Sequence, residues 1–248
     1  MIRILYEDKY LVVCEKPVGV LSAPEPGKRR DMPALLRQQT RAWQIDIIHR
    51  RDQPVGGVMV YSKSRRATPG LYRQMAEHRI TKEYLAVVCG VPPQPSGEYR
   101  DWLLKDAARC KSRVVPCGTP GAKEAVLDYR VLATVQEGGL PLTLVRVRLH
   151  TGRTHQIRVQ FASRRMPLLG DEKYGAPARE NFRGLGLWAC RLAFRHPVTR
   201  QPVDAVCPPP AGYPWSRFGP VLAAEGLSVP DGTAKPVRPQ PPKNPRRP

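Results

Sequence analysis

Residues 45–63 read IDIIHRRDQPVGGVMVYSK and carry the most informative local pattern of the chain. Two short apolar runs, rich in residues that favour strands, flank the charged group His49-Arg50-Arg51-Asp52. Positive charge on the neighbouring arginines favours the ionised form of the Asp52 carboxyl, and an ionised carboxylate can act as a nucleophile. An aspartate that merely ends a strand and hydrogen-bonds its own turn has the same local sequence. The segment therefore predicts two strands and makes Asp52 a candidate catalytic residue.

Runs of the same strand-like composition recur along the chain, bounded by Gly, Pro or Asp. They cover residues 2–6, 10–14, 45–48, 57–62, 83–89, 125–132 and 142–150. Helical patterns are fewer, and they fall on residues 33–42, on a segment ending near residue 79, and on residues 155–165. Because a helix does not follow each strand, the pattern predicts an α+β fold with a mainly antiparallel mixed sheet and flanking helices.

A second polar cluster lies in LHTGRTHQIRVQFASRRMPLLGDEKYGA, residues 149–176. Hydrogen-bond donors gather there at a predicted junction between a strand and a helix. Such a junction can hold a phosphate or pair with a carboxylate from elsewhere in the fold. Ordinary helix capping and surface charge would give the same composition. The donors are those of Thr151, Arg153, Thr154, His155, Gln156 and Arg158.

Tyr84 lies between these two clusters, in ITKEYLAVVCG at residues 80–90. It alternates with Leu85 across a predicted strand, so the two side chains point to opposite faces. A tyrosine in this position packs in the core or stacks on a nucleic-acid base. Its strand alone does not decide between these two possibilities.

The chain is strongly basic, because 41 Lys and Arg residues against 21 Asp and Glu residues give a formal charge of +20 over 248 residues. A charge of this size indicates a polyanionic partner. Residues 226–248 contain seven prolines and almost no apolar side chains, which predicts a disordered basic tail. Five basic residues and Asp231 give this tail a charge of +4, which leaves +16 on residues 1–225. We expect residues 1–225 to form the folded domain.

No apolar run approaches the roughly 20 residues of a membrane helix, and the N-terminus lacks the pattern of a signal peptide. The sequence therefore predicts a cytoplasmic protein without membrane contact. Its six cysteines form no C-x-x-C pair and have no histidine at ligand spacing, which predicts free thiols and no metal site. A cationic surface opposes self-association, so we expect a monomer.

Five segments, taken in order, resemble the large-subunit-type (RluA) family of RNA pseudouridine synthases. They are KPVGVLSAP at residues 16–24, HRRD followed by GGVMVYSK, ITKEYLAVVCG, TGRTHQIRVQF at residues 151–161, and PLLGDEKYG at residues 167–175. The similarity continues to FRHPVTRQPVDAVCPP, which ends at residue 209. One such string is a weak signal, whereas several long strings in family order are a specific one.

The resemblance implies the pseudouridine synthase fold and an isomerase that converts a specific uridine of structured ribosomal or transfer RNA to pseudouridine, without a cofactor. It implies that Asp52 is the nucleophile, that Tyr84 stacks against the flipped-out base, and that Arg158 pairs with Asp52. Many relatives carry an N-terminal S4 RNA-binding domain, and we expect none here. Further contacts with RNA or substrate are expected from His49, Arg50, which would occupy the space of the flipped base, Arg51, Arg153, Thr154, His155 and Gln156.

Two departures from the family pattern affect the expected site. The family usually has H-R-L-D followed by Thr-Ser-Gly, whereas this chain has Arg51 in place of the leucine and Val55-Gly56-Gly57 in place of the second string. Burying an arginine without a partner would cost several kcal/mol. We therefore expect Arg51 to face RNA, and we expect the glycines to alter local packing.

Three other classes of function would each account for part of the sequence. A non-catalytic RNA-binding or RNA-chaperone protein of the same fold would explain the charge and Tyr84, but it would leave Asp52 without a role. A glycosidase would need a second positioned carboxylate, and Glu83 or Asp171 would be the available groups. A methyltransferase would need a glycine-rich loop between a strand and a helix, whereas Gly56 and Gly57 precede a strand. The binding protein is the main alternative.

Overall fold

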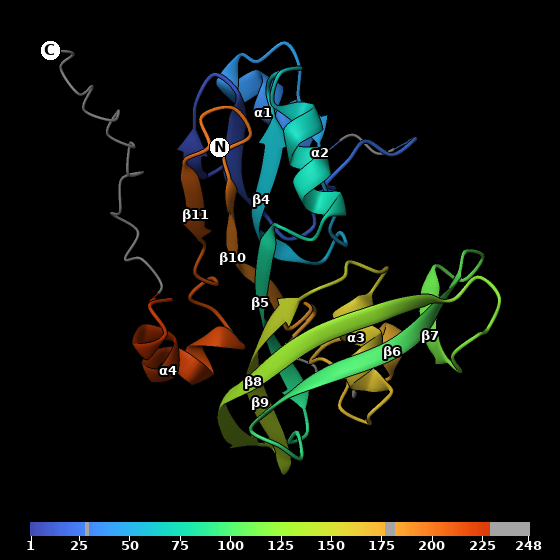
Figure 1. Ribbon diagram of the computed structural model, residues 1–248. Helices are drawn as coiled ribbons and strands as arrows, with labels where there is room; N and C mark the ends of the chain where they lie inside the picture. Colours follow the sequence, from blue (N-terminus) through green and yellow to red (C-terminus); the bar gives the residue numbers. More distant parts are fainter. Residues whose placement is uncertain (28–29, 177–181, 229–248) are drawn as a thin grey trace, which may run out of the picture.

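The computed structural model describes residues 1–27, 30–176 and 182–228. In these residues eleven strands form one sheet, in the order β1-β2-β4-β10-β5-β9-β8-β6-β7, with β3 paired to β4 and β11 paired to β10 (Figure 1). The strands are β1 Ile4–Glu7, β2 Leu11–Lys16, β3 Asp46–Ile47, β4 Gly56–Ser62, β5 Thr81–Cys89, β6 Ser96–Asp106, β7 Lys111–Val115, β8 Lys123–Glu137, β9 Leu140–Leu149, β10 Leu187–Arg195 and β11 Pro202–Val206.

Helices lie beside the sheet, as Figure 1 shows for α2 beside β4 and for α3 beside β6 and β7, and only some of the strands are followed by a helix in the chain. The predicted α+β class with a mainly antiparallel mixed sheet is confirmed. On α3, Ile157 and Phe161 share the buried face that their spacing predicted. The helices are α1 Met32–Thr40, α2 Thr68–Ala76, α3 Gln156–Ala162 and α4 Gly219–Ala224, with short 3₁₀ turns η1 Glu172–Tyr174 and η2 Trp215–Phe218.

Strands β4 and β10 form the one parallel pair among the described strands, and this pair joins the two halves of the sheet. Their register places Gly56 opposite Trp188 and Gly57 opposite Ala189. A Cβ atom at Gly56 would lie 2.2 Å from the Trp188 ring, and one at Gly57 would lie 2.2 Å from the Ala189 carbonyl oxygen. The ring of Trp188 therefore fills the space that a side chain at position 56 would need, which gives Gly56, the middle residue of the Val55-Gly56-Gly57 departure, a packing explanation.

Each of the seven predicted apolar runs overlaps a strand, but β6, β7, β10 and β11 were not predicted. The predicted start of the tail, residue 226, is also too early, because residues 226 and 227 belong to the folded part. Leu227 is 1 % exposed and its N–H donates to the Leu222 carbonyl at 2.8 Å, after Gly226 turns the chain with a φ of 68°. Gly226 and Leu227 therefore cap the C-terminal end of α4, and the Leu227 side chain packs in the core. Residues 229–248 of the expected tail lie outside the described residues.

A row of ion pairs crosses the sheet on the face opposite Tyr84. Glu83 on β5 accepts two hydrogen bonds from Arg146 on β9, at 2.9 and 2.6 Å, and one from Arg191 on β10 at 3.3 Å. Arg146 also bonds Glu225 after α4 at 2.7 Å, and Arg191 bonds Asp204 on β11. One carboxylate, 13 % exposed, therefore links three central strands.

We expect Glu83→Gln to lower the free energy of unfolding by about 2 kcal/mol, because two half-buried arginines lose the same anion. The loss is smaller than for a fully buried pair, since water screens the partly exposed arginines. Urea unfolding followed by circular dichroism measures this. Glu98→Gln is the matched control, since the Glu98 side chain is 46 % exposed beside Arg100 and its loss should change stability by less than about 0.5 kcal/mol. Equal effects of both variants would contradict a central role for Glu83.

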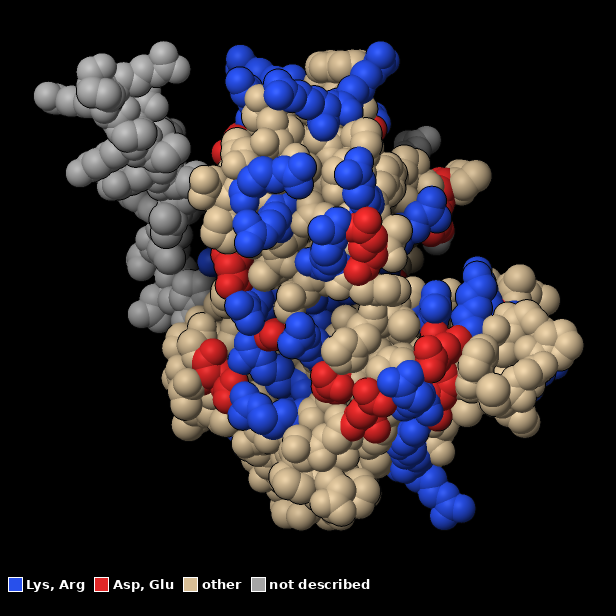
Figure 2. All heavy atoms as spheres, viewed as in Figure 1, with Lys and Arg blue, Asp and Glu red and all other residues tan. Residues whose placement is uncertain are grey.

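Basic side chains cover much of one face of the molecule. Figure 2 shows Lys and Arg spread over the half of this face that carries α1, α2 and β4, with fewer acidic residues among them. In the described part of the chain no helix is long and apolar enough to span a membrane.

Candidate active site

A cavity opens where the loop before β4 meets β5 and the start of α3. Its volume of about 100 Å³ is several times what one water molecule requires. Four segments far apart in the sequence form its wall, and three of them supply eight of the ten predicted site residues. These eight are Arg50, Arg51, Asp52, Tyr84, Arg153, His155, Gln156 and Arg158.

Asp52 is held by a buried arginine that has a second carboxylate behind it. Asp52 Oδ2 lies 3.0 Å from Arg158 Nη1. The Nε and Nη2 groups of Arg158 donate to both carboxylate oxygens of Asp171, each at 2.7 Å. The Asp171 side chain is fully buried, whereas the Asp52 side chain is 26 % exposed in the cavity. Because a two-point bond fixes the plane of the guanidinium, Asp171 aims Nη1 of Arg158 at Asp52.

The charge of Arg158 is secured by the same contacts. Burial by itself would lower the pKa of this guanidinium, but hydrogen bonds and charges from Asp171 and Asp52 outweigh burial and raise its pKa above the ordinary value. One permanent cation thus lies between two carboxylates. Asp171 anchors the cation in the core, and Asp52 meets it at the cavity.

Lys16 fixes the loop that carries Asp52. Its side chain is fully buried, and Nζ donates to the carbonyls of Pro17, Val20 and Gln53 at 3.0, 2.6 and 3.1 Å. Burial is the main cause that lowers the pKa of this ammonium group to about 8. Since Gln53 directly follows Asp52, Lys16 ties the turn after β2 to the position of the carboxylate.

Tyr84 and Arg51 form one side of the cavity together. Tyr84 is 8 % exposed and packs in the main core. The Arg51 guanidinium lies 4.8 Å from the centroid of the Tyr84 ring, and its Nη2 donates to the Val58 carbonyl at 2.5 Å. Its Nε and Nη1 are buried and have no hydrogen-bond partner within the described residues. The sequence predicted an Arg51 that faces RNA, whereas the structure turns its guanidinium onto Tyr84.

We expect Arg51→Leu to raise the free energy of unfolding by about 1 kcal/mol. Each buried donor without a partner costs about 1–3 kcal/mol, whereas the contact with the tyrosine ring returns about 0.5–1 kcal/mol. Urea denaturation at neutral pH measures the difference. Arg50→Leu is the control, because Arg50 is exposed and its replacement should leave stability within about 0.5 kcal/mol. A destabilised Arg51→Leu protein would show that the ring contact dominates.

Two of the predicted RNA-contact residues, His49 and Thr154, are not among the described residues that line the cavity. The His49 ring accepts the Val60 N–H on Nε2 at 3.3 Å, and burial is the main cause that lowers its pKa well below the ordinary value. His49 therefore braces β4 as a neutral side chain. Thr154 is exposed, and its carbonyl accepts a hydrogen bond from Ser112 Oγ at 2.8 Å. The expected contacts of both residues with RNA stay predictions.

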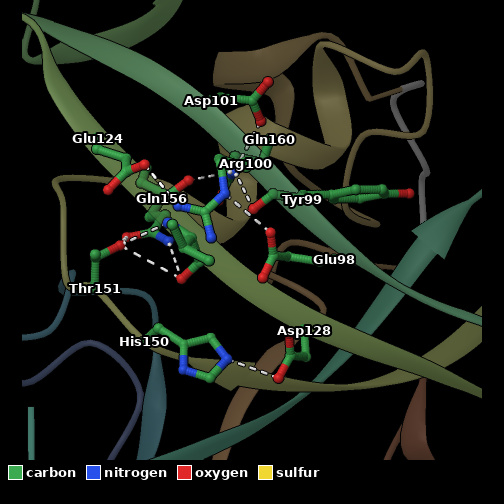
Figure 3. Close-up of polar contacts among 12 residues, drawn as sticks. Glu98, Tyr99, Arg100, Asp101, Glu124, Asp128, His150, Thr151, Gln156 and Gln160 are labelled. Atoms are coloured by element: carbon green, nitrogen blue, oxygen red, sulfur yellow. Dashed lines mark hydrogen bonds and ion pairs between the residues drawn. The ribbon is translucent and has the colours of Figure 1, made fainter.

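Gln156 lines the cavity, but its side-chain amide forms hydrogen bonds with other groups of the protein. Its Oε1 accepts from Thr151 Oγ1 and from the Arg153 N–H at 2.8 and 3.0 Å, and its Nε2 donates to the Val126 carbonyl at 3.1 Å. Figure 3 shows the Thr151 and Gln156 side chains pointing toward one another. Arg153 is bound by the Glu124 carbonyl at 2.7 Å. Gln156 thus shapes the loop before α3, and its expected contact with RNA stays a prediction.

Three supporting residues were not identified from the sequence. Lys16 lies in KPVGV, and Asp171 and Tyr174 lie in PLLGDEKYG, so all three were inside recognised strings. None had a role in the predicted synthase site, and Asp171 was considered only as a second carboxylate of a glycosidase. Tyr174 Oη lies 2.9 Å from Nδ1 of His155, whose Nε2 lies 3.5 Å from Asp52 Oδ2. Their membership of these strings was the available signal. In the described residues no three His, Cys, Asp or Glu side chains gather as a metal site.

Comparison with known proteins defines the class to which this fold and site belong. The family described as RNA pseudouridylate synthase matches residues 10–163, a span that includes Asp52, Tyr84 and Arg158. The chain therefore belongs to the RNA pseudouridylate synthase family, whose members are isomerases.

The chain is similar to two curated relatives and to one solved structure. Ribosomal large subunit pseudouridine synthase D of Haemophilus influenzae is 31 % identical over 230 residues, covering 86 % of this chain and 68 % of the relative. tRNA pseudouridine synthase C of Salmonella typhi is 35 % identical over 226 residues, covering 82 % and 84 %. The structure of human RNA pseudouridylate synthase domain containing 1 is 22 % identical, with a TM-score of 0.71 over 93 % of this chain and 97 % of that one, and it supports the fold.

Proposed function

We propose that the protein converts a specific uridine of structured RNA to pseudouridine, with Asp52 as the nucleophile. The observation that carries the proposal is the Asp52 carboxylate, oriented by Arg158 at the wall of a cavity rich in arginine. One relative is named for the large ribosomal subunit and the other for tRNA. The substrate class that these names support is therefore ribosomal or transfer RNA.

The chemistry requires one bond between sugar and base to be exchanged for another. The bond between ribose C1′ and uracil N1 breaks, the base turns, and C5 bonds to C1′ as the C5 proton is lost and N1 gains a proton. Asp52 starts the exchange either by attack on C1′ or by removal of a C2′ proton, and Arg158 orients the carboxylate in both routes. Atoms balance within the nucleotide, so no other reactant is needed.

The target base must leave its stack to reach this carboxylate, at a cost of a few kcal/mol. We propose that Tyr84 provides the aromatic surface for the extruded base and that Arg50, exposed at the cavity, occupies the vacated space. Phosphate contacts from the basic body offset part of the cost. Arg51 already rests on the Tyr84 ring, so the base and this guanidinium compete for the ring or share it.

We further propose that residues 1–225 hold the catalytic activity, that the folded body extends through Leu227, and that the protein acts as a cytoplasmic monomer. The +16 charge of residues 1–225 supports RNA binding by the body itself. The prolines and basic residues that follow would add salt-sensitive affinity for phosphates.

Tritium release tests the proposed reaction directly. RNA labelled with tritium at uridine C5 is prepared from a strain that lacks this gene, and the purified protein is added. Release of tritium is expected, because the C5 proton is lost only when C5 bonds to C1′. Folded protein that binds this RNA without releasing tritium would favour the alternative, a non-catalytic RNA-binding or RNA-chaperone protein.

A further inference from the structure

A chain of polar contacts leads from the protein backbone to Asp52. The N–H of Ser112 on β7 donates to Tyr174 Oη at 2.8 Å. Tyr174 Oη lies 2.9 Å from His155 Nδ1, and His155 Nε2 lies 3.5 Å from Asp52 Oδ2. The last distance is long for a hydrogen bond, as is common in sites without substrate. The four groups come from β7, η1, the start of α3 and the loop before β4.

The hydrogen bond from Ser112 favours one direction for the next bond in the chain. A backbone N–H can only donate, so Tyr174 Oη accepts from Ser112 and keeps its own proton free to donate. Nδ1 of His155 is the acceptor within reach of that proton. A neutral imidazole that accepts on Nδ1 carries its proton on Nε2. The Nε2–H group then faces the Asp52 carboxylate.

The backbone holds His155 in this position against its intrinsic preference. His155 has a φ of 55°, a left-handed conformation that is uncommon for residues other than glycine and costs of order 1–3 kcal/mol. The preceding carbonyl, that of Thr154, is bound by Ser112 Oγ, and the rings of His155 and Tyr174 meet edge to face at 88°. Ser112 therefore anchors both the tyrosine and the histidine.

Burial, more than the surrounding charges, keeps His155 neutral. Burial is the largest influence and lowers the pKa of the imidazole; Asp52 opposes this effect, Arg158 and Lys173 add to it, and Asp171 opposes it. The net shift is downward, so the neutral ring predominates at pH 7. The groups that face this ring are the carboxylates of Asp52 and Asp171, the cations of Arg158 and Lys173, and the hydroxyl of Tyr174.

We propose that Tyr174 locks His155 in the neutral Nε2–H form and that His155, as a positioning residue, supplies Asp52 with a second, uncharged donor. The proposal rests on Asp52 as the nucleophile. A neutral donor orients the carboxylate while Arg158 remains its one cationic partner in the described site. A protonated His155 would form a second ion pair with Asp52 and weaken its nucleophilic attack. The reaction should therefore slow as pH falls through the titration of His155.

Nitrogen NMR of the whole protein labelled with ¹⁵N-histidine tests the lock without any RNA. The chain has five histidines, and His155→Gln identifies the signal of interest. At pH 7 we expect an unprotonated Nδ1 and a protonated Nε2, with a titration midpoint below that of an ordinary histidine. Tyr174→Phe should mix the two tautomers and raise the midpoint, because the neutral form loses its donor. Tyr72→Phe, a change at an exposed hydroxyl bound to the Ile47 carbonyl, should leave the signal unaltered.

Single-turnover tritium release then tests the positioning role. His155→Gln and Tyr174→Phe should lower the rate by on the order of 10²-fold, as expected for a misplaced reacting group. RNA affinity should be unchanged. The acid limb assigned to His155 should disappear from the pH profile of His155→Gln. An Nδ1–H tautomer or a charged ring at pH 7 would overturn the proposal, and so would an unaltered pH profile. If no variant or wild-type protein releases tritium, the proposed function fails while the NMR result still decides the lock.

Discussion

Asp52→Asn is expected to lower the single-turnover rate of pseudouridine formation by on the order of 10⁴-fold, the size of effect seen when a central catalytic carboxylate is removed. The amide keeps the shape of the side chain, and its carbonyl oxygen still accepts the hydrogen bond from Arg158. It has no negative charge with which to attack C1′ or to remove a C2′ proton. Rapid-mixing tritium release at saturating enzyme measures the chemical step, and filter binding measures RNA affinity.

Affinity should stay within about threefold of the wild type, because Asp52 contributes chemistry and repels rather than attracts phosphate. Asp128→Asn is the matched control: its carboxylate is 47 % exposed, pairs with His150 and lies outside the cavity lining formed by the described residues. That variant should retain wild-type rates. Substantial turnover by Asp52→Asn would remove the carboxylate from the mechanism and leave the cavity as a binding site.

Asp171→Asn is expected to lower both stability and rate, by about 3–5 kcal/mol for unfolding, because it leaves the buried guanidinium of Arg158 without its internal anion. The freed guanidinium can then rotate, so Asp52 loses its fixed orientation and the rate should fall by on the order of 10²-fold. Thermal and urea unfolding give the first quantity, and single-turnover tritium release gives the second.

A double variant separates the two roles of this pair. Arg158→Met combined with Asp171→Leu removes both buried charges and keeps apolar volume, a type of replacement that is often neutral or stabilising. It should recover most of the stability lost in Asp171→Asn and remain inactive, since Asp52 has no cation to orient it. A double variant that is as unstable as the single one would indicate that the pair serves packing, and an active one would exclude Arg158 from the reaction.

The sequence predicted the centre of the site because its residues stand in long, ordered strings. Asp52, Tyr84 and Arg158 lie in three such strings, and the structure brings them to one cavity although Asp52 and Arg158 are 106 positions apart. These sequence motifs could not predict which partner each polar side chain hydrogen-bonds. Gln156 and His49 have the donors and acceptors of RNA-contacting residues, but their partners are backbone groups and neighbours that become visible only after folding.

The same limit explains the strands that were missed. β6 reads SGEYRDWLLKD, and most of its residues are exposed or half-buried, so it lacks the apolar run that marks β2 or β4. β10 carries Arg191 in its middle, and this charge is satisfied by Glu83 and Asp204 on neighbouring strands. Hydropathy patterns in a sequence reveal the apolar face of a strand. They do not reveal charged residues whose partners lie on neighbouring strands of the sheet.

The contact between Gly56 and Trp188 has a consequence for how this site can change over evolutionary time. Any side chain at position 56 would collide with the indole, and β4 begins there, four residues after Asp52. A larger residue at 56 would therefore be selected against unless position 188 had first become smaller. A smaller residue at 188 alone would leave a void beside Gly56, at the start of β4. The two positions thus form an epistatic pair, in which the order of mutations decides which paths stay open.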